Sequence, residues 1–220
     1  MNSAIEPESS HEEPALRRLD HLVCNVPDIE RYHSHFVEVL GFPEAWPIGR
    51  FWLDAQTSGI ALGGINLEFV QADNDPPIRA AIDTLVFEPT SLMAAERKFA
   101  SLGVRTNIRE KIESNPDLLR LRGFTNIHEP QLICRNLELT SDFPIPMFLC
   151  EYSPFLKERL ANIPTLHGKV TSIHGPWDVA KIAELGYLGD IEFVPSPTIA
   201  IKLENGPLFQ KGLDPGFWFI

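Results

Sequence analysis

Two segments of the chain share a pattern that predicts a strand, a turn and a helix. The first is LDHLVCNVPDIERYHSHFVEVLGF, which starts at Leu19, and the second is IDTLVFEPTSLMAAERKFASLGV, which starts at Ile82. In each, an apolar run is followed by a turn that ends in a suitable helix N-cap, Asp28 or Ser91. Apolar residues at helical spacing come next, and each helix pattern is followed by Leu-Gly.

The spacing inside the two segments agrees as well. His21 in the first strand lies 15 positions before Phe36 in the first helix, and Thr84 lies 15 positions before Phe99 in the second. Agreement over both the strand and the helix indicates that a β-α unit is duplicated in the chain.

The two copies also end alike, because each closes with an apolar strand that has one central glutamate. These strands are INLEFV with Glu68 and MFLCEYS with Glu151. Asn66, Glu68 and Val70 share one face, since side chains alternate along a strand. Each copy has room for two further strands, expected at GRFWLDA and SGIALGG in the first and at GFTNI and QLICRNLEL in the second. The extra length of the second copy is expected in NIREKIESNPDLLRLRG, before Phe124.

The expected fold class is therefore α+β, with two βαβββ modules and no alternation of strands with helices. We expect the modules at residues 16–75 and 76–153, after an acidic, disordered leader at residues 1–15. Residues 154–220 contain VTSIHGPWDVAKIAELG, which predicts a strand, a turn and a short helix with Asp178 as its N-cap. This C-terminal part is expected to form a partial third βαβ module outside the pocket.

The doubled unit resembles the vicinal oxygen chelate superfamily. Members include glyoxalase I, methylmalonyl-CoA epimerase, the extradiol dioxygenases, and the fosfomycin and bleomycin resistance proteins. The residues that carry the resemblance are LDHLV, VPD, GIALG with NLE, and CEY, within residues 17–153. The resemblance implies that the paired modules curl into one curved mixed sheet with a central cavity. It also implies that the first and last strands of both modules hold a divalent metal ion.

Carried over position by position, the resemblance implies three metal ligands, His21, Glu68 and Glu151. Thr84 stands where catalytic members usually carry a second histidine. Imidazole and carboxylate ligands suit Fe, Mn, Co, Ni or Zn. Glu151 is also the expected catalytic base. The expected substrate-pocket residues are Thr84, Asn66 and Arg50, the last being either a carboxylate contact at the pocket mouth or a surface arginine.

Three functions follow from this resemblance. The first is a metal-dependent isomerase or lyase that acts on a small oxygenated substrate. The second is a non-catalytic small-molecule binding or resistance protein of the same fold, which Thr84 favours. The third is an extradiol-type dioxygenase, which the missing second histidine makes less favourable. Taken singly, His21 could be a hydrogen-bonded core histidine and Glu68 a solvent-facing strand residue; their joint presence with Glu151 favours a shared site.

Composition narrows the class of partner. The chain has 19 Lys and Arg residues against 30 Asp and Glu residues, a net charge of −11, which argues against nucleic acid or an anionic membrane as partner. No apolar run approaches the roughly 18 residues needed to span a bilayer. The expected partner is a small-molecule substrate. The apolar ending GFWFI is expected to dock on the body of the protein or on a second subunit, which would make a homodimer.

The cysteines and the N-terminus indicate the compartment. Cys24, Cys134 and Cys150 are an odd number of cysteines without CxxC spacing, and each lies in an apolar strand-like run. We expect reduced, buried thiols. The polar start MNSAIEPESSHEEP does not have the pattern of a signal peptide. A cytoplasmic location is therefore expected.

Overall fold

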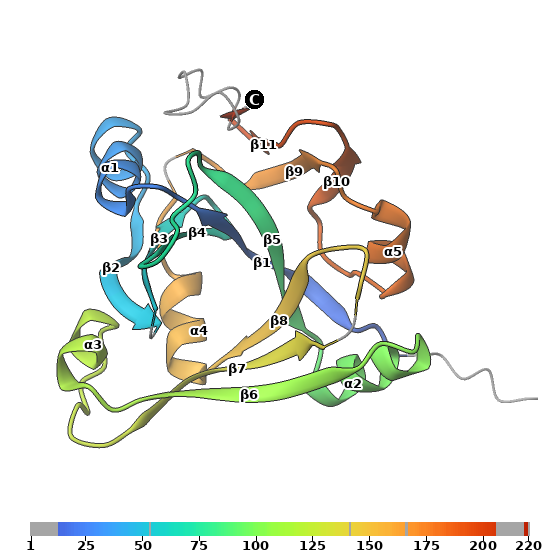
Figure 1. Cartoon of the computed structure of the whole chain (residues 1–220), viewed down its shortest axis with the longest axis horizontal. Coiled ribbons are helices and arrows are strands. Elements are labelled where there is room, and N and C mark those ends of the chain that lie inside the picture. The colour runs from blue at the N-terminus through green and yellow to red at the C-terminus, as the bar shows by residue number, and fades with distance from the viewer. Residues whose placement is uncertain (1–12, 53, 141, 166, 206–217, 220) are drawn as a thin grey trace, which may run out of the picture.

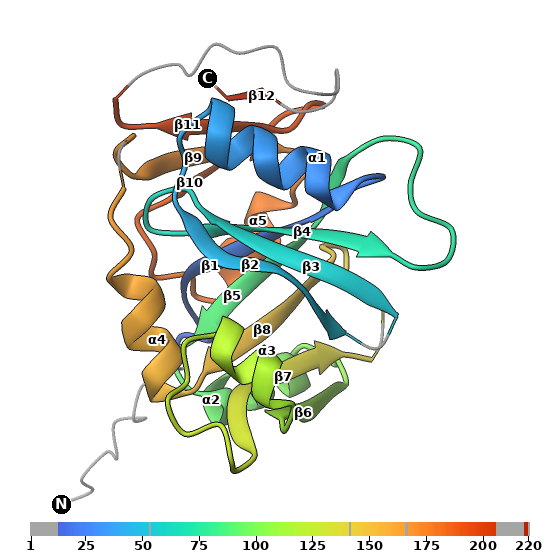
Figure 2. The same ribbon diagram turned by 90° about the vertical axis from the view of Figure 1, so that its left-hand side faces the viewer.

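The protein is described by a computed structural model over residues 13–52, 54–140, 142–165, 167–205 and 218–219, so most of the expected leader lies outside the described residues. Eight strands form one curled mixed sheet in the order β2-β3-β4-β1-β5-β8-β7-β6 (Figures 1 and 2). The sheet wraps into a half-barrel with a concave inner face. The expected α+β fold with paired βαβββ modules is confirmed. No helix in the described part of the chain is long and apolar enough to cross a membrane.

The first module begins with a strand and a helix, as the repeat predicts. Asp28 caps the helix by accepting a hydrogen bond from the backbone N–H of Arg31 at 3.0 Å. The elements are β1 (Leu16–Asn25), α1 (Ile29–Ser34), a π-helical continuation η1 (His35–Val39), β2 (Glu44–Trp52), β3 (Ala55–Ala61) and β4 (Asn66–Ala72).

The second module repeats this order with one additional helix. Ser91 caps its first helix by accepting a hydrogen bond from the N–H of Ala94 at 3.0 Å. The elements are β5 (Ala81–Pro89), α2 (Leu92–Ser101), β6 (Thr106–Glu113), α3 (Pro116–Leu121), β7 (Gln131–Leu139) and β8 (Met147–Tyr152).

Strands β1 and β5 join the modules as an antiparallel pair, and their register is symmetric about Leu22 opposite Leu85. His21 pairs with Val86, and Val23 pairs with Thr84. Under this symmetry, Thr84 has the position in β5 that His21 has in β1. Each strand also has an irregularity in register next to this site, at Asp20 in β1 and at Asp83 in β5. The repeated Asp-His and Asp-Thr pairs therefore mark β-bulges.

One strand prediction from the sequence is wrong. GFTNI at residues 123–127 is not a strand, and the strand of this region is β6, within the segment that we expected to be an insertion. The outer face of β6 carries Ile108 and Ile112, which are exposed, and its remaining residues are mostly charged. Because β6 is an edge strand with little apolar burial, its sequence lacks the pattern of a buried strand.

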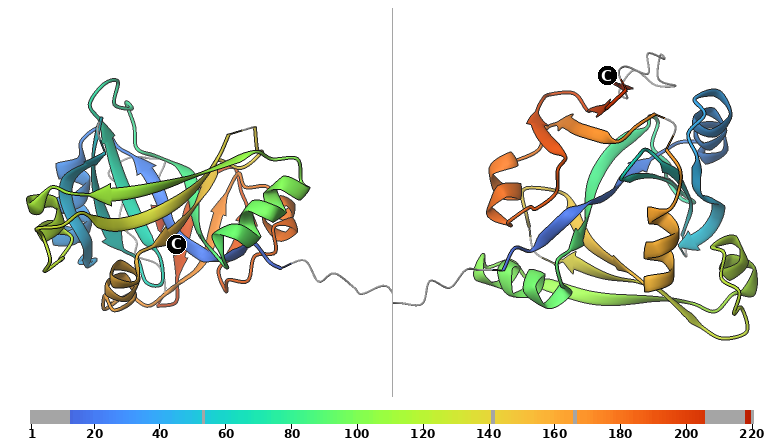
Figure 3. Two further views of the ribbon diagram at one scale, coloured as in Figure 1. Left: turned by 90° about the horizontal axis from the view of Figure 1, so that it is seen from below. Right: turned by 180° about the vertical axis from the view of Figure 1, so that it is seen from behind.

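The C-terminal part forms a second sheet in the order β10-β9-β11-β12, on the opposite side of the half-barrel from α3 (Figure 3). Its first two strands are parallel and are joined by a helix that Asp178 caps, so the predicted partial βαβ module is confirmed. The elements are α4 (Pro154–Ala161), β9 (Val170–Gly175), α5 (Val179–Glu184), β10 (Glu192–Pro195), β11 (Ala200–Leu203) and β12 (Trp218–Phe219).

The Gly-Gly turn between β3 and β4 ties the first module to this C-terminal part. The carbonyl of Gly63 accepts a hydrogen bond from the N–H of Val170 at 3.0 Å. Gly63 and Gly64 both have positive φ, but a Cβ on Gly63 would lie 2.0 Å from the carbonyl oxygen of Gly168, whereas a Cβ on Gly64 meets nothing within 4 Å. Gly63 and Gly64 therefore share the left-handed backbone conformation but differ in the room that a side chain would have.

This difference predicts unequal effects of alanine at the two positions. Gly64→Ala should cost about 1 kcal/mol of unfolding free energy, the strain of a left-handed alanine. Gly63→Ala should cost about 1–3 kcal/mol more, because the added methyl forces the backbone of the C-terminal part to move. Urea unfolding of both variants measures the difference. Equal costs would contradict the close approach at Gly63.

Candidate functional site

A cavity of about 40 Å³ lies on the concave face of the half-barrel, with room for a few water-sized groups. Strands of both modules and helix α4 contribute to its wall, so the site depends on the paired architecture. Its lining residues are His21, Ala45, Trp46, Trp52, Glu68, Lys111, Arg122, Ile133, Cys134, Asn136, Phe148, Cys150, Tyr152, Leu156, Arg159 and Leu160.

His21 is buried in this wall and is held by two carboxylates. Its Nδ1 lies 2.8 Å from Oδ2 of Asp20, and its Nε2 lies 3.3 Å from Oε2 of Glu68, an ion-pair distance without hydrogen-bond geometry. Neighbouring residues on a regular strand face opposite ways, but the bulge lets Asp20 reach the ring beside it. Burial alone lowers the pKa of His21, yet Asp20 and Glu68 outweigh burial and raise the pKa to about 9.

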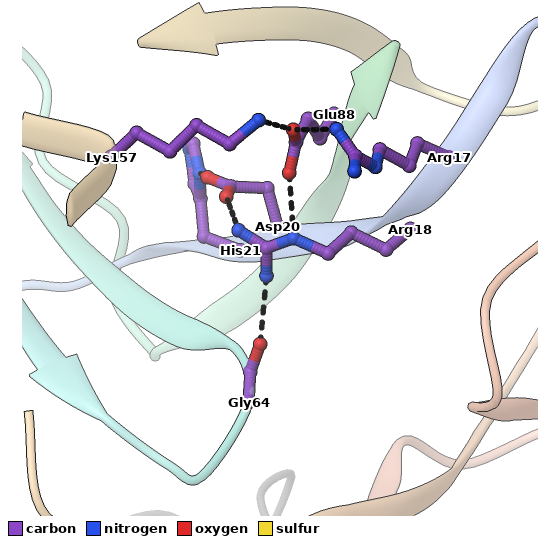
Figure 4. Close-up of polar contacts among 7 residues, drawn as sticks. All are labelled: Arg17, Arg18, Asp20, His21, Gly64, Glu88 and Lys157. Carbon is purple, nitrogen blue, oxygen red and sulfur yellow. Dashed lines mark hydrogen bonds and ion pairs between the residues drawn. The ribbon is translucent and has the colours of Figure 1, made fainter. Parts of the chain in front are cut away.

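A second layer of ionic contacts holds Asp20 in place (Figure 4). The guanidinium of Arg18 donates to Oδ1 of Asp20 at 2.9 Å and to Oε2 of Glu88 at 2.7 Å. Arg17 and Lys157 also pair with Glu88. Burial would raise the pKa of Glu88, but Lys157 and Arg18 lower it overall. Glu88 therefore orients Arg18, Arg18 holds the carboxylate of Asp20 in place, and Asp20 orients the ring of His21.

A larger cavity of about 450 Å³ lies beside this ionic cluster. Arg17, Arg18, Glu88 and Lys157 line it, and Leu160 of α4 lines both cavities. Asn66, which we expected in the substrate pocket, lines this second cavity.

Glu68 is the acidic group of the first cavity. Burial raises the pKa of a carboxylic acid, but His21, Lys111 and Arg122 outweigh burial and lower the pKa of Glu68. Glu68 is therefore ionised at neutral pH, and His21 beside it is protonated. The His21 and Glu68 side chains therefore form a buried ion pair with no net charge.

Lys111 and Arg122 bring positive charge into the same cavity. The ammonium of Lys111 lies 3.8 Å from the ring centre of Trp52, and the guanidinium of Arg122 lies 4.1 Å from that of Phe51. Within the described residues, neither cation has a carboxylate oxygen within 4.0 Å. Four buried polar atoms of the wall have no hydrogen-bond partner in the described structure: Nε2 of His21, Nε of Arg122, Oδ1 of Asn136 and Nε1 of Trp46.

The two ring contacts also close the half-barrel. Lys111 belongs to β6 and Arg122 directly follows α3, whereas Phe51 and Trp52 belong to β2. Strands β6 and β2 are the two edges of the sheet. We call these two contacts the cation–π clasp.

Glu151 does not share the cavity with His21 and Glu68. Val23 pairs with Glu68 in the first module, and the equivalent pair in the second is Val86 with Phe148. Phe148 thus stands where Glu68 stands, and its ring packs edge-on against that of His21. Glu151 points to the other face of the sheet, where it lies 3.7 Å from Arg135. The expected match of Glu151 with Glu68 is therefore corrected to Phe148.

Two further expected pocket residues also lie away from the cavity. Thr84 is half-exposed, and its hydroxyl donates to Oδ1 of Asp83 at 3.0 Å. Arg50 is exposed and pairs with Asp73 at 2.9 Å. The structure therefore brings together only His21 and Glu68 of the expected metal and pocket residues.

The residues present do not fit a divalent metal ion. The four positions that the resemblance assigns to ligands hold His21, Glu68, Thr84 and Phe148 in this structure, so a phenyl ring replaces one donor. Thr84 is half-exposed and donates its hydroxyl to Asp83, so His21 and Glu68 are the two strong donors among these four side chains. In the described part of the chain, no group of three or more His, Cys, Asp or Glu side chains could hold a metal.

The cations of this site were not expected from the sequence. Lys111 faces inward although Ile108 and Ile112, on the same strand, face outward. The usual rule that apolar residues face inward thus gives the wrong face for β6. Arg122 lies in the turn after α3, where strand alternation carries no information. A basic residue within the NIREKIE stretch was the only signal in the sequence.

Solved structures similar to this one share its fold at low sequence identity. A hypothetical protein from Staphylococcus aureus matches with a TM-score of 0.61 and 10% identity, over 92% of this chain and 98% of that chain. A variant of homoprotocatechuate 2,3-dioxygenase from Brevibacterium fuscum matches with a TM-score of 0.50 and 15% identity. The match covers 89% of this chain but only 59% of the dioxygenase. No protein-family model and no curated protein matches the sequence.

Proposed function

We propose that this chain, which has the vicinal oxygen chelate fold, binds a small organic anion in the cavity of its half-barrel. The observation that supports this most is the pair of cations Lys111 and Arg122 in the wall; Arg159 is a third cation of the wall, and its guanidinium donates to the carbonyl of Arg122. Glu68 acts on Lys111 and Arg122 through space but pairs with His21, and in the described part of the chain neither of these two cations has a carboxylate oxygen within 4.0 Å. A buried charge is costly unless it is paired. A carboxylate ligand would supply the missing partner.

The rest of the wall suits the carbon part of such a ligand. Trp46, Phe148 and Leu156 provide apolar and aromatic surface, and Asn136 and Trp46 provide unpaired polar atoms that can orient a ligand. Binding sites typically combine apolar walls with a few polar groups of this kind. The small volume favours short carboxylates.

The metal-dependent isomerase or lyase and the dioxygenase have less support than this binding function. Both need at least three donors around a metal, and His21 and Glu68 are the only expected ligands in the cavity. The non-catalytic binding protein, which was the alternative from the sequence, agrees better with a cavity that has cations in its wall and a neutralised histidine.

Substitution of either cation should weaken the binding of short carboxylates. Lys111→Met or Arg122→Gln removes one charge-assisted contact, worth about 1.5–3 kcal/mol, which raises Kd by about 10- to 100-fold. Calorimetric titration with a panel of short carboxylates, each compared with its neutral amide, measures this effect. The wild-type protein should prefer the carboxylate over the amide.

Arg120→Gln is the matched control, because Arg120 lies two residues before Arg122, in the last turn of α3, and pairs with Asp117 at the surface. It should leave Kd unchanged. Treatment with a metal chelator should also leave Kd unchanged. Equal binding of carboxylates and amides, or binding that disappears with the chelator, would contradict the proposed anion site.

A further inference from the structure

Two cysteines lie side by side in the wall of the cavity. Cys134 on β7 and Cys150 on β8 both line it, and they are diagonal neighbours on the paired strands, since Cys134 pairs with Tyr152 and Asn136 pairs with Cys150. The structure has all three cysteines as free thiols. Cys24 lies apart from this pair, in the apolar core on the other face of the sheet.

The surroundings of Cys134 are positively charged. Lys111 is its direct cross-strand partner, so the two side chains lie next to each other on the inner face. Arg122 lines the same cavity with a buried Nε that has no hydrogen-bond partner in the described structure. A thiol beside such cations forms its thiolate more readily, and the thiolate is the reactive species.

The three thiols differ in their tendency to ionise. The neighbouring Cys150 thiol has the largest effect on the pKa of Cys134 and lowers it; burial opposes this, and Lys111 and Arg122 reinforce it. The neighbouring Cys134 thiol, together with burial, raises the pKa of Cys150 well above its usual value. Burial raises the pKa of Cys24. Only Cys134 combines access from the cavity with an environment that favours the thiolate.

We propose that Cys134 is a nucleophilic site that adds to small α,β-unsaturated carbonyl compounds entering the cavity. Its sulfur forms a bond to the β-carbon, the carbon–carbon π bond breaks, and the electron pair moves onto the carbonyl oxygen as an enolate. The enolate takes up one proton at the α-carbon, which balances the proton lost by the thiol. Nothing leaves, and no oxidant or reductant is used. Lys111 and Arg122, in the same wall, stabilise the enolate charge.

This inference goes beyond anion binding and can be tested without it, because acrylamide is a small, uncharged member of this class. The full-length protein is incubated with acrylamide, and the modification of each cysteine is followed by peptide mass spectrometry. Cys134 should react about tenfold faster than Cys150 and Cys24, because it lies beside the Lys111 ammonium and the thiolate is the reactive form. Cys150 and Cys24 thus serve as internal controls in the wild-type protein.

Two variants test the cause of the reactivity. Lys111→Met should slow the reaction of Cys134 by about tenfold, whereas Lys202→Met, on an exposed face of β11, should leave it unchanged. Cys150→Ala should also slow Cys134, because it removes the neighbouring thiol that lowers the pKa of Cys134. The proposal is overturned if Cys134 reacts no faster than Cys24, or if Lys111→Met leaves its rate unchanged in a folded protein.

Discussion

As the pH rises from 6.5 to about 9, the protein is expected to lose about 3 kcal/mol of unfolding free energy through the titration of one buried side chain, His21. The pKa of this histidine rises from 6.5 in the unfolded chain to about 9 in the folded protein. A group with a raised folded-state pKa contributes its full stability below the unfolded value and loses it as pH rises through the folded value. Stability should therefore fall across this window.

The acidic partner gives the opposite dependence at low pH. The pKa of Glu68 is lowered by His21, so its contribution is present above the usual pKa of a glutamate and is lost on acidification. Because the lowered pKa of Glu68 and the raised pKa of His21 describe one interaction, the two contributions are not added.

Urea unfolding at several pH values between 6.5 and 9 measures this effect. His21→Gln should lower stability overall and flatten its dependence on pH in that window, and His128→Gln, at an exposed position, should keep the wild-type slope. The same slope in wild type and His21→Gln would show that another group is responsible. A nuclear magnetic resonance titration of the His21 ring gives the folded-state pKa directly.

Phe87→Ala is expected to cost about 3–5 kcal/mol, the usual effect of removing a buried phenyl ring. Phe87 is 0% exposed and lies on the outer face of β5. Its ring packs edge-on against Tyr187 at 5.7 Å and lies 5.9 Å from Phe193, both in the C-terminal part. The truncation therefore removes packing between the half-barrel and the second sheet.

Phe155→Ala is the control, because Phe155 is 41% exposed and packs on Phe124 at 4.5 Å. It should cost about 1 kcal/mol, the value of an aromatic pair at the surface. Urea unfolding measures both costs, and limited proteolysis should show faster cleavage between β9 and β11 only in Phe87→Ala. If the two variants lost similar stability, the second sheet would not depend on Phe87.

The parts of the fold that follow from local pattern could be predicted. The N-caps Asp28 and Ser91 depend on a few neighbouring residues, and both act as expected. The alignment of His21 with Thr84 agrees with the register of β1 and β5, because both strands lie close to their turns and helices. The inward position of Glu68 also follows from alternation within one short strand.

The remaining features depend on register over long distances. Glu151 was matched to Glu68 because each is the only acid in its strand, but the longer second module shifts the true match to Phe148. Lys111 was missed because the edge strand β6 turns its apolar residues outward. A shift of one residue reverses the face of a strand, so pattern alone could not place these side chains.

The cation–π clasp has a consequence for the mobility of the two sheet edges. Each ring contact is worth about 0.5–2 kcal/mol, so separating both costs roughly 1–4 kcal/mol, and the separated form is populated at about 0.1–15%. Strands β6 and β2 can move apart at this point only when Lys111 and Arg122 leave the rings of Trp52 and Phe51. The two edges of the half-barrel therefore stay together for most of the time.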